Sequence, residues 1–532
     1  MAAHAIPEGN FPAAPFDLAR SQFESLVTTL STAETQSMTH SELETLLQRQ
    51  GAEVMRQLLQ DHLTLRGPGA VAAGSVTGAD DVVRTHQRLQ ERVLMTVFGA
   101  VVVARMAYGM RHHASLKPLD GALNLPEERY SHGLQRRVAE EAAKTSFDEV
   151  VATVKRTTAA EIPKRQVEQA VVRSAQDFEE FYESRSVASL EKVQDTGVIM
   201  VVTSDAKGVR MHREDLREVT REAAEQRADD AAGTGFSLGL PSATDVERDR
   251  KRMAQVAAVY TIKPFVRSPD DVVGELQRVR AVQQQRPRPE NKRVWASVKQ
   301  DPAEVLGAAF AEARARDPEL VKQWVALVDG NGPQLLTLLA MARVDGVKLT
   351  LIVDFIHVAE YVWKAAHALH GRGSEEAAKW VRERLAEILR GNSSLVAGGM
   401  RRSATLRKLN ANQRKDVDKC ANYLLKYAPY LRYHEYLAAG FPIATGVIEG
   451  ACRYLVKDRM EITGAVWRLD SAEAVLQLRA LRASGDFDAY WAFHENQERQ
   501  RNHVECYADG LPAVEAAPPP TPLRLPHLRV VK

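Results

Sequence analysis

The spacing of apolar side chains predicts helices at the N-terminus and a strand pair after them. Between residues 16 and 65, Leu, Phe and Met recur every three or four positions, which is the period of an amphipathic helix. A stretch rich in Gly and Ala, residues 67–78, interrupts this pattern. Apolar runs at residues 94–98 and 101–106 then flank Gly99, and we expect them to form two strands that turn at this glycine.

Three short helices are expected in the next part of the chain. The first covers residues 133–144 and the third covers residues 164–174. The second begins after Ser146, because Ser146 and Glu149 have the spacing of a capping box. The last two helices fit a helix-turn-helix over about residues 146–175, although a helical hairpin with no role in DNA binding has the same pattern. The polar side chains placed to reach base edges are Lys164, Arg165 and Gln166.

After residue 190 the pattern changes to that of strands. Residues 198–205 are apolar and β-branched until they end in polar side chains, which predicts a strand buried on both faces. Residues 208–211 are expected to begin its hairpin partner, and residues 253–262 to form a third strand. The stretch between them, residues 213–252, is charged and poor in large apolar side chains, so we expect a mobile insertion there.

Strands and helices then alternate. Helices are expected at residues 301–316 and 333–343, and strands at residues 324–328 and 348–353. The resulting order is three strands, a helix, a strand, a helix and a strand, followed by further helix. This is the order of an RNase H-like fold, an α/β fold in which helices flank a mixed five-stranded sheet. The alternation implies parallel crossover connections in the second half.

Two aspartates stand at the ends of predicted strands. Asp205 ends the first strand, and Asp354 directly follows the last one. Polar side chains at strand ends lie at the mouth of an α/β sheet, where ligands bind. Phosphodiester chemistry uses two divalent cations about 4 Å apart, and magnesium prefers hard oxygen ligands. We therefore expect two Mg²⁺ ions, which Mn²⁺ could replace, with Asp205 bridging both ions and Asp354 completing one of them.

Such a site needs a third carboxylate, and Glu449 is the candidate. A glutamate in a helix is seldom functional by itself, so this candidate depends on the two aspartates. We expect Thr445 to cap a helix whose apolar side consists of Ile448, Cys452 and Leu455. Basic side chains suited to phosphates then flank the carboxylate: Arg453, Lys457 and Arg459.

A histidine and a further aspartate lie near these positions. His357 follows Asp354 by three residues, about one helical turn, so both side chains can face the same way. A neutral imidazole there could orient a scissile phosphate or the attacking hydroxyl; the alternative is a histidine at a helix start that is hydrogen-bonded to a loop. Asp329 also ends a strand, and its Asp-Gly-Asn-Gly context favours a turn former over an auxiliary acid.

The charge of the chain is concentrated in one segment. The 532 residues carry a net charge of only +2, which by itself does not indicate a nucleic-acid binder. Residues 388–432, however, contain ten basic and two acidic side chains, a net charge of +8. Such a segment in a nearly neutral protein indicates a polyanionic partner, and the alternative is a solvated helical face. The candidates for DNA contact in it are Arg401, Arg402, Arg407 and Lys408.

Cysteine usage and hydropathy exclude several classes of protein. The three cysteines, at positions 420, 452 and 506, form no Cys-x-x-Cys pair, so we expect free buried thiols and neither a thiolate zinc site nor a disulfide framework. No apolar run reaches the roughly 20 residues of a membrane-spanning helix. The first 15 residues lack the Lys or Arg that precedes a secretory signal. We therefore expect a cytoplasmic, nucleoid-associated protein with no membrane partner.

Several segments together resemble one known family, the ISKra group of bacterial insertion-sequence transposases. The resemblance covers about residues 85–500, and each segment is a weak signal by itself. The segments are Leu-Asn-Leu-Pro at 123–126, Tyr-Ser-His-Gly-Leu at 130–134, Ala-Glu-Glu-Ala-Ala at 139–143, Val-Thr-Ser-Asp-Ala-Lys-Gly-Val at 202–209, Asp-Phe-Ile-His-Val at 354–358, Gly-Val-Ile-Glu-Gly-Ala-Cys at 446–452 and Gly-Ala-Val-Trp at 464–467.

This family belongs to the DDE transposases, and the resemblance implies that Asp205, Asp354 and Glu449 are the metal-binding triad. The Asp-x-x-His motif ending at His357 is similar to that of Mutator-type and related cut-and-paste enzymes. The 95 positions from Asp354 to Glu449 then correspond to a helical insertion whose basic segment clamps transposon-end or target DNA. Many relatives carry a cysteine-rich zinc element near the N-terminus. This chain departs from that pattern, because it has no cysteine before position 420.

Six regions are expected along the chain. They are an N-terminal helical region (1–80), a DNA-binding region with the helix-turn-helix (81–190), an RNase H-like catalytic core (191–365), a helical basic insertion (366–440), the remainder of the core with the Glu449 helix and a closing helix (441–500), and a flexible tail (501–532).

The expected function is metal-dependent DNA cleavage and strand transfer at the inverted-repeat ends of an insertion sequence. We expect a homo-oligomer, a dimer or larger, because two transposon ends must be processed together with target DNA. A related nuclease without strand transfer would have the same metal site. A domesticated regulator that uses only the helix-turn-helix is a further alternative, but such a protein need not keep three carboxylates.

Overall fold

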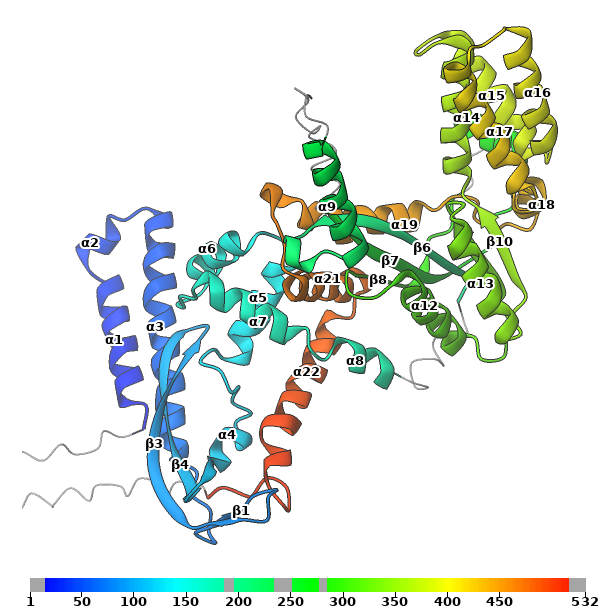
Figure 1. Ribbon diagram of the computed structural model, residues 1–532. Coiled ribbons are helices and arrows are strands. Elements are labelled where there is room, and N and C mark those ends of the chain that lie inside the picture. Colours follow the sequence, from blue (N-terminus) through cyan, green and yellow to red (C-terminus); the bar gives the residue numbers. More distant parts are fainter. Residues whose placement is uncertain (1–14, 186–195, 234–250, 277–284, 516–532) are drawn as a thin grey trace, which may run out of the picture. The chain divides into compact units, whose positions relative to one another are not determined.

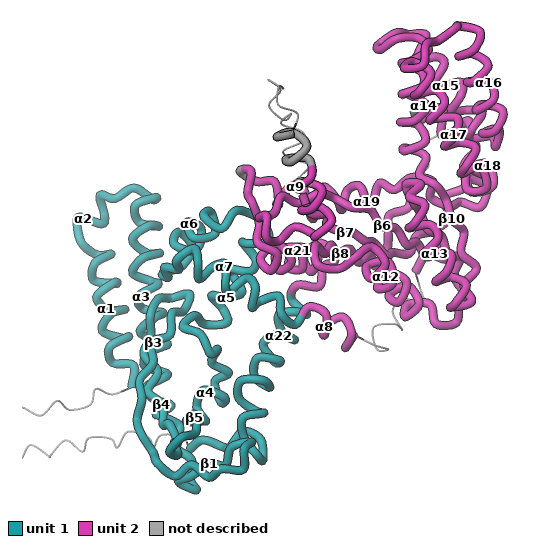
Figure 2. Tube along the Cα trace, in the orientation of Figure 1, with its two compact units in different colours: residues 1–177, 488–532 teal, residues 178–487 magenta. Residues whose placement is uncertain are grey.

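A computed structural model describes residues 15–185, 196–233, 251–276 and 285–515 (Figure 1). The chain divides into two compact units (Figure 2). Unit 1 comprises Met1–Asp177 and Asp488–Lys532, and unit 2 comprises Phe178–Phe487. Among the described residues, no helix combines the length and the apolarity needed to cross a membrane.

Unit 1 begins with the predicted helices. They are α1 (Asp17–Leu30), α2 (Ala33–Gln36) and α3 (His40–Arg66). Thr39 and Glu42 form a capping box at the start of α3. The helix ends at Gly67, whose φ of +69° is a left-handed conformation that glycine adopts without strain. The break predicted from the Gly- and Ala-rich stretch is therefore confirmed.

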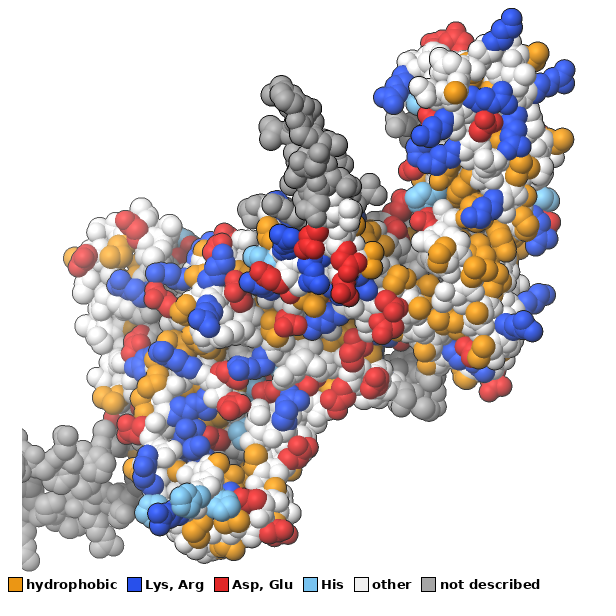
Figure 3. Space-filling view, in the orientation of Figure 1, with side chains coloured by type: hydrophobic (Ala, Val, Ile, Leu, Met, Phe, Trp, Pro, Cys, Tyr) orange, Lys and Arg blue, Asp and Glu red, His pale blue; other side chains and the backbone are white. Residues whose placement is uncertain are grey.

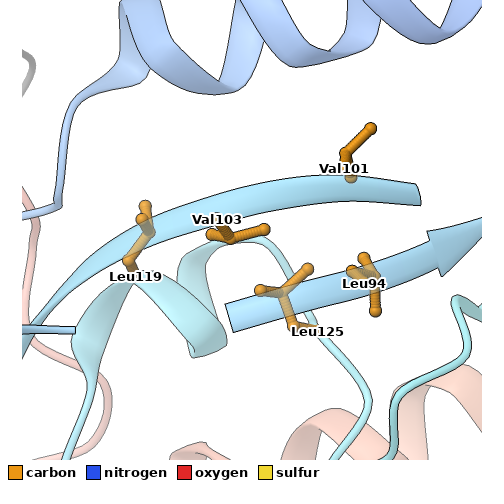
Figure 4. Packing of buried hydrophobic residues seen from close by; sticks show 5 residues of the cluster. All are labelled: Leu94, Val101, Val103, Leu119 and Leu125. Atoms are coloured by element: carbon orange, nitrogen blue, oxygen red, sulfur yellow. The ribbon is translucent and has the colours of Figure 1, made fainter. Parts of the chain in front are cut away.

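The predicted strand pair is a long hairpin of β3 (His86–Thr96) and β4 (Gly99–Met110), followed by the short strand β5 (His113–Leu116). The hairpin closes with Thr96 opposite Gly99, so Gly99 is the first residue of the second strand and the turn lies just before it. Figure 4 shows the buried cluster formed here by Leu94, Val101, Val103, Leu119 and Leu125, against which Leu59 and Leu63 of α3 pack.

The three short helices of unit 1 follow the prediction closely. They are α5 (His132–Ala142), α6 (Phe147–Thr157) and α7 (Lys164–Ser174). The Ser146 hydroxyl accepts a hydrogen bond from the Glu149 amide at 3.2 Å, which satisfies one free donor at the start of α6. Pro163 precedes α7, because its fixed φ suits a helix start. The helices are thus observed, and their role as a helix-turn-helix stays a prediction.

The end of the chain differs from its predicted place. Most of α22 (Phe487–Asn502) belongs to unit 1, although the sequence placed residues up to 500 with the catalytic core. The following residues were expected to form a flexible tail. Instead, Tyr507 is buried against Val76 and Tyr108. The Glu515 amide also donates to the carbonyl oxygen of Ala70 at 2.7 Å. An aromatic anchor and backbone hydrogen bonds to the start of the chain's unit 1 therefore hold this segment, and the apolar periodicity of the sequence revealed neither. The rest of the tail lies outside the described residues.

Unit 2 is built on a mixed five-stranded sheet, as predicted. The strand order is β10-β9-β6-β7-β8. Strand β6 runs antiparallel to β7, and β7 antiparallel to β8, whereas β6, β9 and β10 are parallel to one another. The strands are β6 (Ile199–Arg210), β7 (Lys251–Ile262), β8 (Glu290–Ser297), β9 (Gln323–Val328) and β10 (Leu349–Val353).

Two details of this sheet correct the sequence prediction. Residues 208–211 do not begin a hairpin partner, because β6 continues through Gly208 and pairs with β7 without interruption up to Arg210. The fifth strand of the sheet is instead β8, which was not predicted from the sequence. Its first half, Glu290–Arg293, consists of polar side chains, so its pattern lacks the apolar alternation of a half-buried strand. Within the described ranges of the chain, β8 is the last strand of the sheet and pairs with β7 alone.

Helices connect and cover the strands of unit 2. The sheet carries α12 (Pro302–Arg316), α13 (Gly332–Val344), α19 (Gly446–Ala451) and α21 (Leu469–Ser484) (Figure 1). The charged stretch predicted as an insertion contains α9 (Glu218–Gly233), while residues 234–250 lie outside the described residues. Two short helices, α8 (Phe178–Ser184) and α11 (Pro269–Leu276), complete this part.

The segment between β10 and α19 is helical, as predicted. It contains α14 (Phe355–His370), α15 (Glu375–Leu389), α16 (Ser393–Leu406), α17 (Ala411–Lys426) and α18 (Tyr433–Ala438). Tyrosines of this helical insertion donate hydrogen bonds to the backbone at the ends of β10 and β9. The hydroxyl of Tyr433 donates to the carbonyl oxygen of Val353 at 2.7 Å, and that of Tyr423 to Asp329 at 2.9 Å. The insertion is thus attached to the sheet edge where the predicted aspartates lie.

Candidate metal centre

Asp354 lies at the junction of β10 and α14 and is completely buried. Its Oδ1 accepts a hydrogen bond from the Ile356 amide at 2.6 Å, which caps α14. Its Oδ2 accepts from the Thr445 amide at 3.0 Å and from the Thr445 hydroxyl. Burial raises the pKa of this carboxyl to about 6, and the negative charge of Glu449 adds to the effect, while the two amides and His357 oppose it.

Asp354, His357 and Glu449 converge on one point. Each offers a ligand atom, and these atoms lie within 4.8 Å of one another. His357 is one turn along α14 from Asp354, and it is partly buried. Glu449 is exposed and lies one turn into the helix that Thr445 begins. Because Thr445 holds Asp354, the same contact brings Glu449 to the end of β10. These three residues form a group that could hold a metal ion.

Asp205 is connected to this group indirectly. It lies on β6 two residues beyond Thr203, the last residue of β6 that pairs with β9. Its Oδ2 accepts a hydrogen bond from the Cys452 thiol at 3.3 Å, and its Oδ1 accepts from the Ala206 amide at 2.7 Å. Within the described residues, Asp205 is not part of the group whose ligand atoms lie within 4.8 Å. The structure therefore brings two of the three predicted carboxylates, Asp354 and Glu449, together. Cys452 links the third, Asp205, to the helix that carries Glu449.

The separation of the two aspartates follows from the strand order. Strand β9 lies between β6, which carries Asp205, and β10, which precedes Asp354. Neighbouring strands are about 4.8 Å apart, so the backbones of β6 and β10 are separated by roughly 10 Å. Side chains or bound ions must bridge this distance for Asp205 and Asp354 to act on one substrate.

The helix that carries Glu449 changes its winding three residues after it. Residues Cys452–Lys457 form a π-helix that continues α19 and leads into α20 (Asp458–Met460). Such wide turns are uncommon and occur frequently at functional sites. The predicted apolar side is confirmed, because Ile448, Cys452 and Leu455 are all buried. Thr445 begins the helix, but its hydroxyl binds Asp354 and makes no capping bond to the helix.

The predicted basic flank is only partly present. Arg453 and Lys457 are exposed on the π-helix, and Arg453 lies 3.7 Å from Asp458. Arg459, in contrast, is 1% exposed, and its guanidinium lies over the Trp467 ring at 4.8 Å from the ring centre. Burial and the charge of Arg479 lower its pKa to about 10. The prediction for Arg459 was wrong, because the π-helix turns this side chain towards the core.

The basic residues of the helical insertion have different environments. Figure 3 shows Lys and Arg gathered over this part of the surface. Arg401 donates to the Asn422 side chain at 2.5 Å, and Arg407 donates to the carbonyl oxygen of Leu369 at the end of α14. Within the described part of the chain, Arg402 and Lys408 are exposed and have no ion-pair partner. Together with Lys415 and Lys419, which are likewise exposed and without an ion-pair partner in this part of the chain, they are available to an anionic partner.

The polar residues at the start of α7 face solvent to different degrees. Lys164 forms an ion pair with Asp148 at 2.8 Å, in which both side chains are more than half exposed. Arg165 is exposed, and Gln166 donates to Gln169 at 2.8 Å. A surface ion pair of this kind is weak, so Lys164 can exchange its partner for a phosphate at little cost.

Unit 1 contains a second group of possible metal ligands, which the sequence pattern did not reveal. Asp177, His494 and Glu498 are buried and bring their ligand atoms within 4.8 Å of one another. Arg501, however, donates to both oxygens of Asp177 at 3.0 and 3.2 Å and to Glu498 at 2.7 Å. A guanidinium thus takes the place that a cation would take, and we interpret the group as a structural ion-pair network. The i, i+4 spacing of His494 and Glu498 on α22 was its only local signal.

Asp329 has the role that its sequence context favoured. Its Oδ1 accepts a hydrogen bond from the Asn331 amide at 2.9 Å, which forms a turn between β9 and α13.

In comparisons with known proteins, no protein-family model matches this chain, and no curated protein matches it.

Proposed function

We propose that this protein is a DNA transposase of the DDE type that cleaves DNA and transfers strands at the ends of an insertion sequence. The observation that carries this proposal is the convergence of Asp354 and Glu449, 95 positions apart in the sequence, with His357 beside them. The strand order and directions of the unit 2 sheet support it, because an RNase H-like core has the same arrangement. The segment resemblance to the ISKra group supports it independently.

The donor set fits a hard divalent cation. Asp354 and Glu449 offer carboxylate oxygens, His357 offers a ring nitrogen, and Asp205 offers a further carboxylate across the end of β9. Burial and the negative charge of Asp205 raise the pKa of the Cys452 thiol, so this group remains neutral and does not add a soft thiolate ligand. This chemistry suits Mg²⁺, or Mn²⁺ in its place. Two such ions, when bound, lower the pKa of an attacking water and stabilise the leaving oxygen of a phosphodiester.

The residues around the centre have positioning roles in this proposal. Thr445 fixes the orientation of Asp354, because its amide and its hydroxyl both donate hydrogen bonds to Oδ2 of Asp354. His357 orients the scissile phosphate or the attacking hydroxyl. Arg453 and Lys457, exposed on the π-helix next to Glu449, bind backbone phosphates of the substrate. The basic helical insertion holds transposon-end or target DNA beside the same centre.

Recognition of inverted-repeat DNA is assigned to α6 and α7, with Lys164, Arg165 and Gln166 at the start of the second helix. A helix start in the major groove is the usual arrangement of such motifs. The protein acts as a homo-oligomer, a dimer or larger, on two transposon ends, and it is associated with the nucleoid.

The test uses the protein with labelled DNA that carries the sequences flanking its own coding region. Asp205→Asn and Glu449→Gln are compared with the parent in Mg²⁺, and the exposed Glu319→Gln serves as a matched control. We expect cleavage by the parent and the control, and a loss of at least about 100-fold in each triad variant, because each removes a metal ligand. Normal cleavage by both triad variants would show that the assignment is wrong.

Pre-cut ends separate the proposed transposase from a nuclease. With such ends and a target plasmid, a transposase joins the free 3′-hydroxyl to the target, whereas a nuclease yields only hydrolysed strands. Binding without either reaction would favour the alternative of a DNA-binding regulator.

A further inference from the structure

A cavity of about 460 Å³ opens beside the candidate metal centre. Two of its lining residues, Phe355 and Ile356, directly follow Asp354, and two others, Gly446 and Val447, lie just before Glu449. The cavity and the carboxylates are therefore built on the same two segments of chain. Its volume lies within the range of sites that hold a small organic ligand.

Backbone hydrogen bonds hold the walls of this cavity in place. The Phe265 amide donates to the carbonyl oxygen of Gly440 at 2.9 Å, and the Phe355 amide donates to that of Ile443 at 2.9 Å. Gly440 has a φ of +76°, and a Cβ atom there would meet the backbone nitrogen of Phe265 at 2.7 Å. Only glycine allows the two segments to approach so closely. The cavity is a built feature of unit 2.

The lining combines aromatic faces with basic groups. Phe265 and Phe441 are partly exposed in the cavity, and Tyr260 is buried behind them. Lys263, Arg267 and Arg286 provide positive charge, and the Arg267 guanidinium lies over the Phe265 ring at 4.8 Å from the ring centre. Glu275, the acidic residue of the lining, lies 3.8 Å from Arg267 and also contacts Arg286, so the lining has a net charge of +2. Lys263 lies 3.8 Å from Glu290, which is outside the lining, and one positive charge remains when this pair is included.

The geometry points to an occupant that is flat, apolar on its faces and attached to negative charge. We propose that this cavity receives a single nucleobase, unstacked from the DNA duplex next to the phosphodiester held at the metal centre. The aromatic rings stack on the base, and the basic groups face the phosphates on either side of it. This inference rests on the proposed function, because the metal centre supplies the substrate strand. Enzymes that do chemistry on a base extrude its nucleotide from the duplex and stack the base on aromatic side chains in the same way.

The test compares Phe441→Ala and Phe265→Ala with the parent and with Leu336→Ala, an exposed residue of α13 that does not line the cavity. The substrates are transposon-end duplexes that carry one abasic nucleotide at successive positions around the cleavage site. We expect each phenylalanine variant to cleave the intact duplex about tenfold or more slowly, as the loss of one stacking contact implies. An abasic nucleotide at one position should restore cleavage to within about threefold of the parent, because no base then needs to be stacked.

The abasic substrate distinguishes this role from a structural one, since a variant that merely misfolds is not rescued by a change in the DNA.

A second readout does not require cleavage. A 2-aminopurine at the same position, in the absence of metal, should brighten severalfold on binding to the parent and at least twofold less with Phe441→Ala. Cleavage without rescue or brightening would overturn the cavity assignment alone. Brightening without cleavage would leave the cavity assignment intact and overturn the proposed function, and failure of both would overturn both.

Discussion

The thiol of Cys452 donates a hydrogen bond to Oδ2 of Asp205 across 3.3 Å, although 247 positions separate the two residues. Cys452 is the first residue of the π-helix that follows α19, so this bond ties the middle of β6 to the helix that carries Glu449. The contact keeps one oxygen of Asp205 oriented in a region where the strand has lost its parallel neighbour. Asp205 is thus connected to the Asp354–His357–Glu449 group indirectly, through the helix that Cys452 shares with Glu449.

This contact predicts different effects of two substitutions at Cys452. Cys452→Val removes the donor but keeps a buried side chain of similar size, so we expect Mg²⁺-dependent cleavage to fall about tenfold or more, as for a lost hydrogen bond to a charged group. Cys452→Ser retains a donor and should stay within about threefold of the parent. Cleavage rates over a series of Mg²⁺ concentrations provide the measurement. Equal rates for the valine variant and the parent would show that Asp205 does not depend on this bond.

The raised pKa of Asp354 predicts how Mg²⁺ binding depends on pH. In the free protein this carboxyl has a pKa of about 6, so below that pH a proton must leave before the metal can bind. Apparent Mg²⁺ affinity should fall about tenfold for each pH unit below 6 and should be insensitive to this group above it. Thermal-shift titrations with Mg²⁺ between pH 5 and 8 measure the affinity. A flat profile across this range would contradict the prediction.

The same raised pKa determines whether the metal-free protein becomes more or less stable as the pH rises. Between the ordinary value of 3.8 and about 6, folded Asp354 retains a proton that the unfolded chain has released. Stability from this group is therefore greatest below pH 3.8 and falls as pH rises to 6, by about 3 kcal/mol in total. Asp354→Asn should lack this part of the pH dependence in EDTA. Denaturant unfolding of both proteins at several pH values tests it, and identical pH profiles would contradict the assignment.

Arg402 and Lys408 should affect DNA binding without affecting the fold. Both are exposed, and neither has an ion-pair partner within the described residues. The double variant Arg402→Glu, Lys408→Glu should bind all DNA sequences more weakly, and its slope of log affinity against log salt should decrease by about 2. Its melting temperature should equal that of the parent. Lys379→Glu, exposed on α15 outside the basic segment, is the control. Unchanged affinity and salt slope would remove the insertion from the DNA-binding surface.

The buried network around Asp177 should respond to substitution but not to chelation. Asp177→Asn leaves Arg501 and His494 without their shared carboxylate, and we expect a loss of about 3–5 kcal/mol in the free energy of unfolding. Asp148→Asn, in an exposed ion pair, should cost less than about 1 kcal/mol. EDTA should have no effect on the melting of unit 1 when it is measured in Glu449→Gln protein. If EDTA lowered the melting temperature of unit 1 as much as Asp177→Asn does, the group would instead hold a bound metal.

Local patterns predicted most of the helices and strands, although not β8. The third short helix occupies Lys164–Ser174 as predicted, because Pro163 and the polar residues after it act within one turn. Strand β10 ends at Val353, directly before Asp354, since an apolar run that stops in polar residues marks the end of a buried strand. These signals depend on neighbouring residues only, so they are present in the sequence itself. The identification of Asp354 and Glu449 as candidate ligands came from such signals together with the family resemblance.

Only the tertiary structure decided how these elements meet. The order of the strands places β9 between the two aspartates, and the contact of Thr445 with Asp354 brings Glu449 to the end of β10. The continuation of β6 through Gly208 depends on its pairing with β7, and no local pattern encodes that pairing. Burial and pKa depend on which distant side chains surround a group. For that reason Asp205, Asp354 and Glu449 could be predicted as candidate ligands from the sequence, whereas their mutual geometry could not.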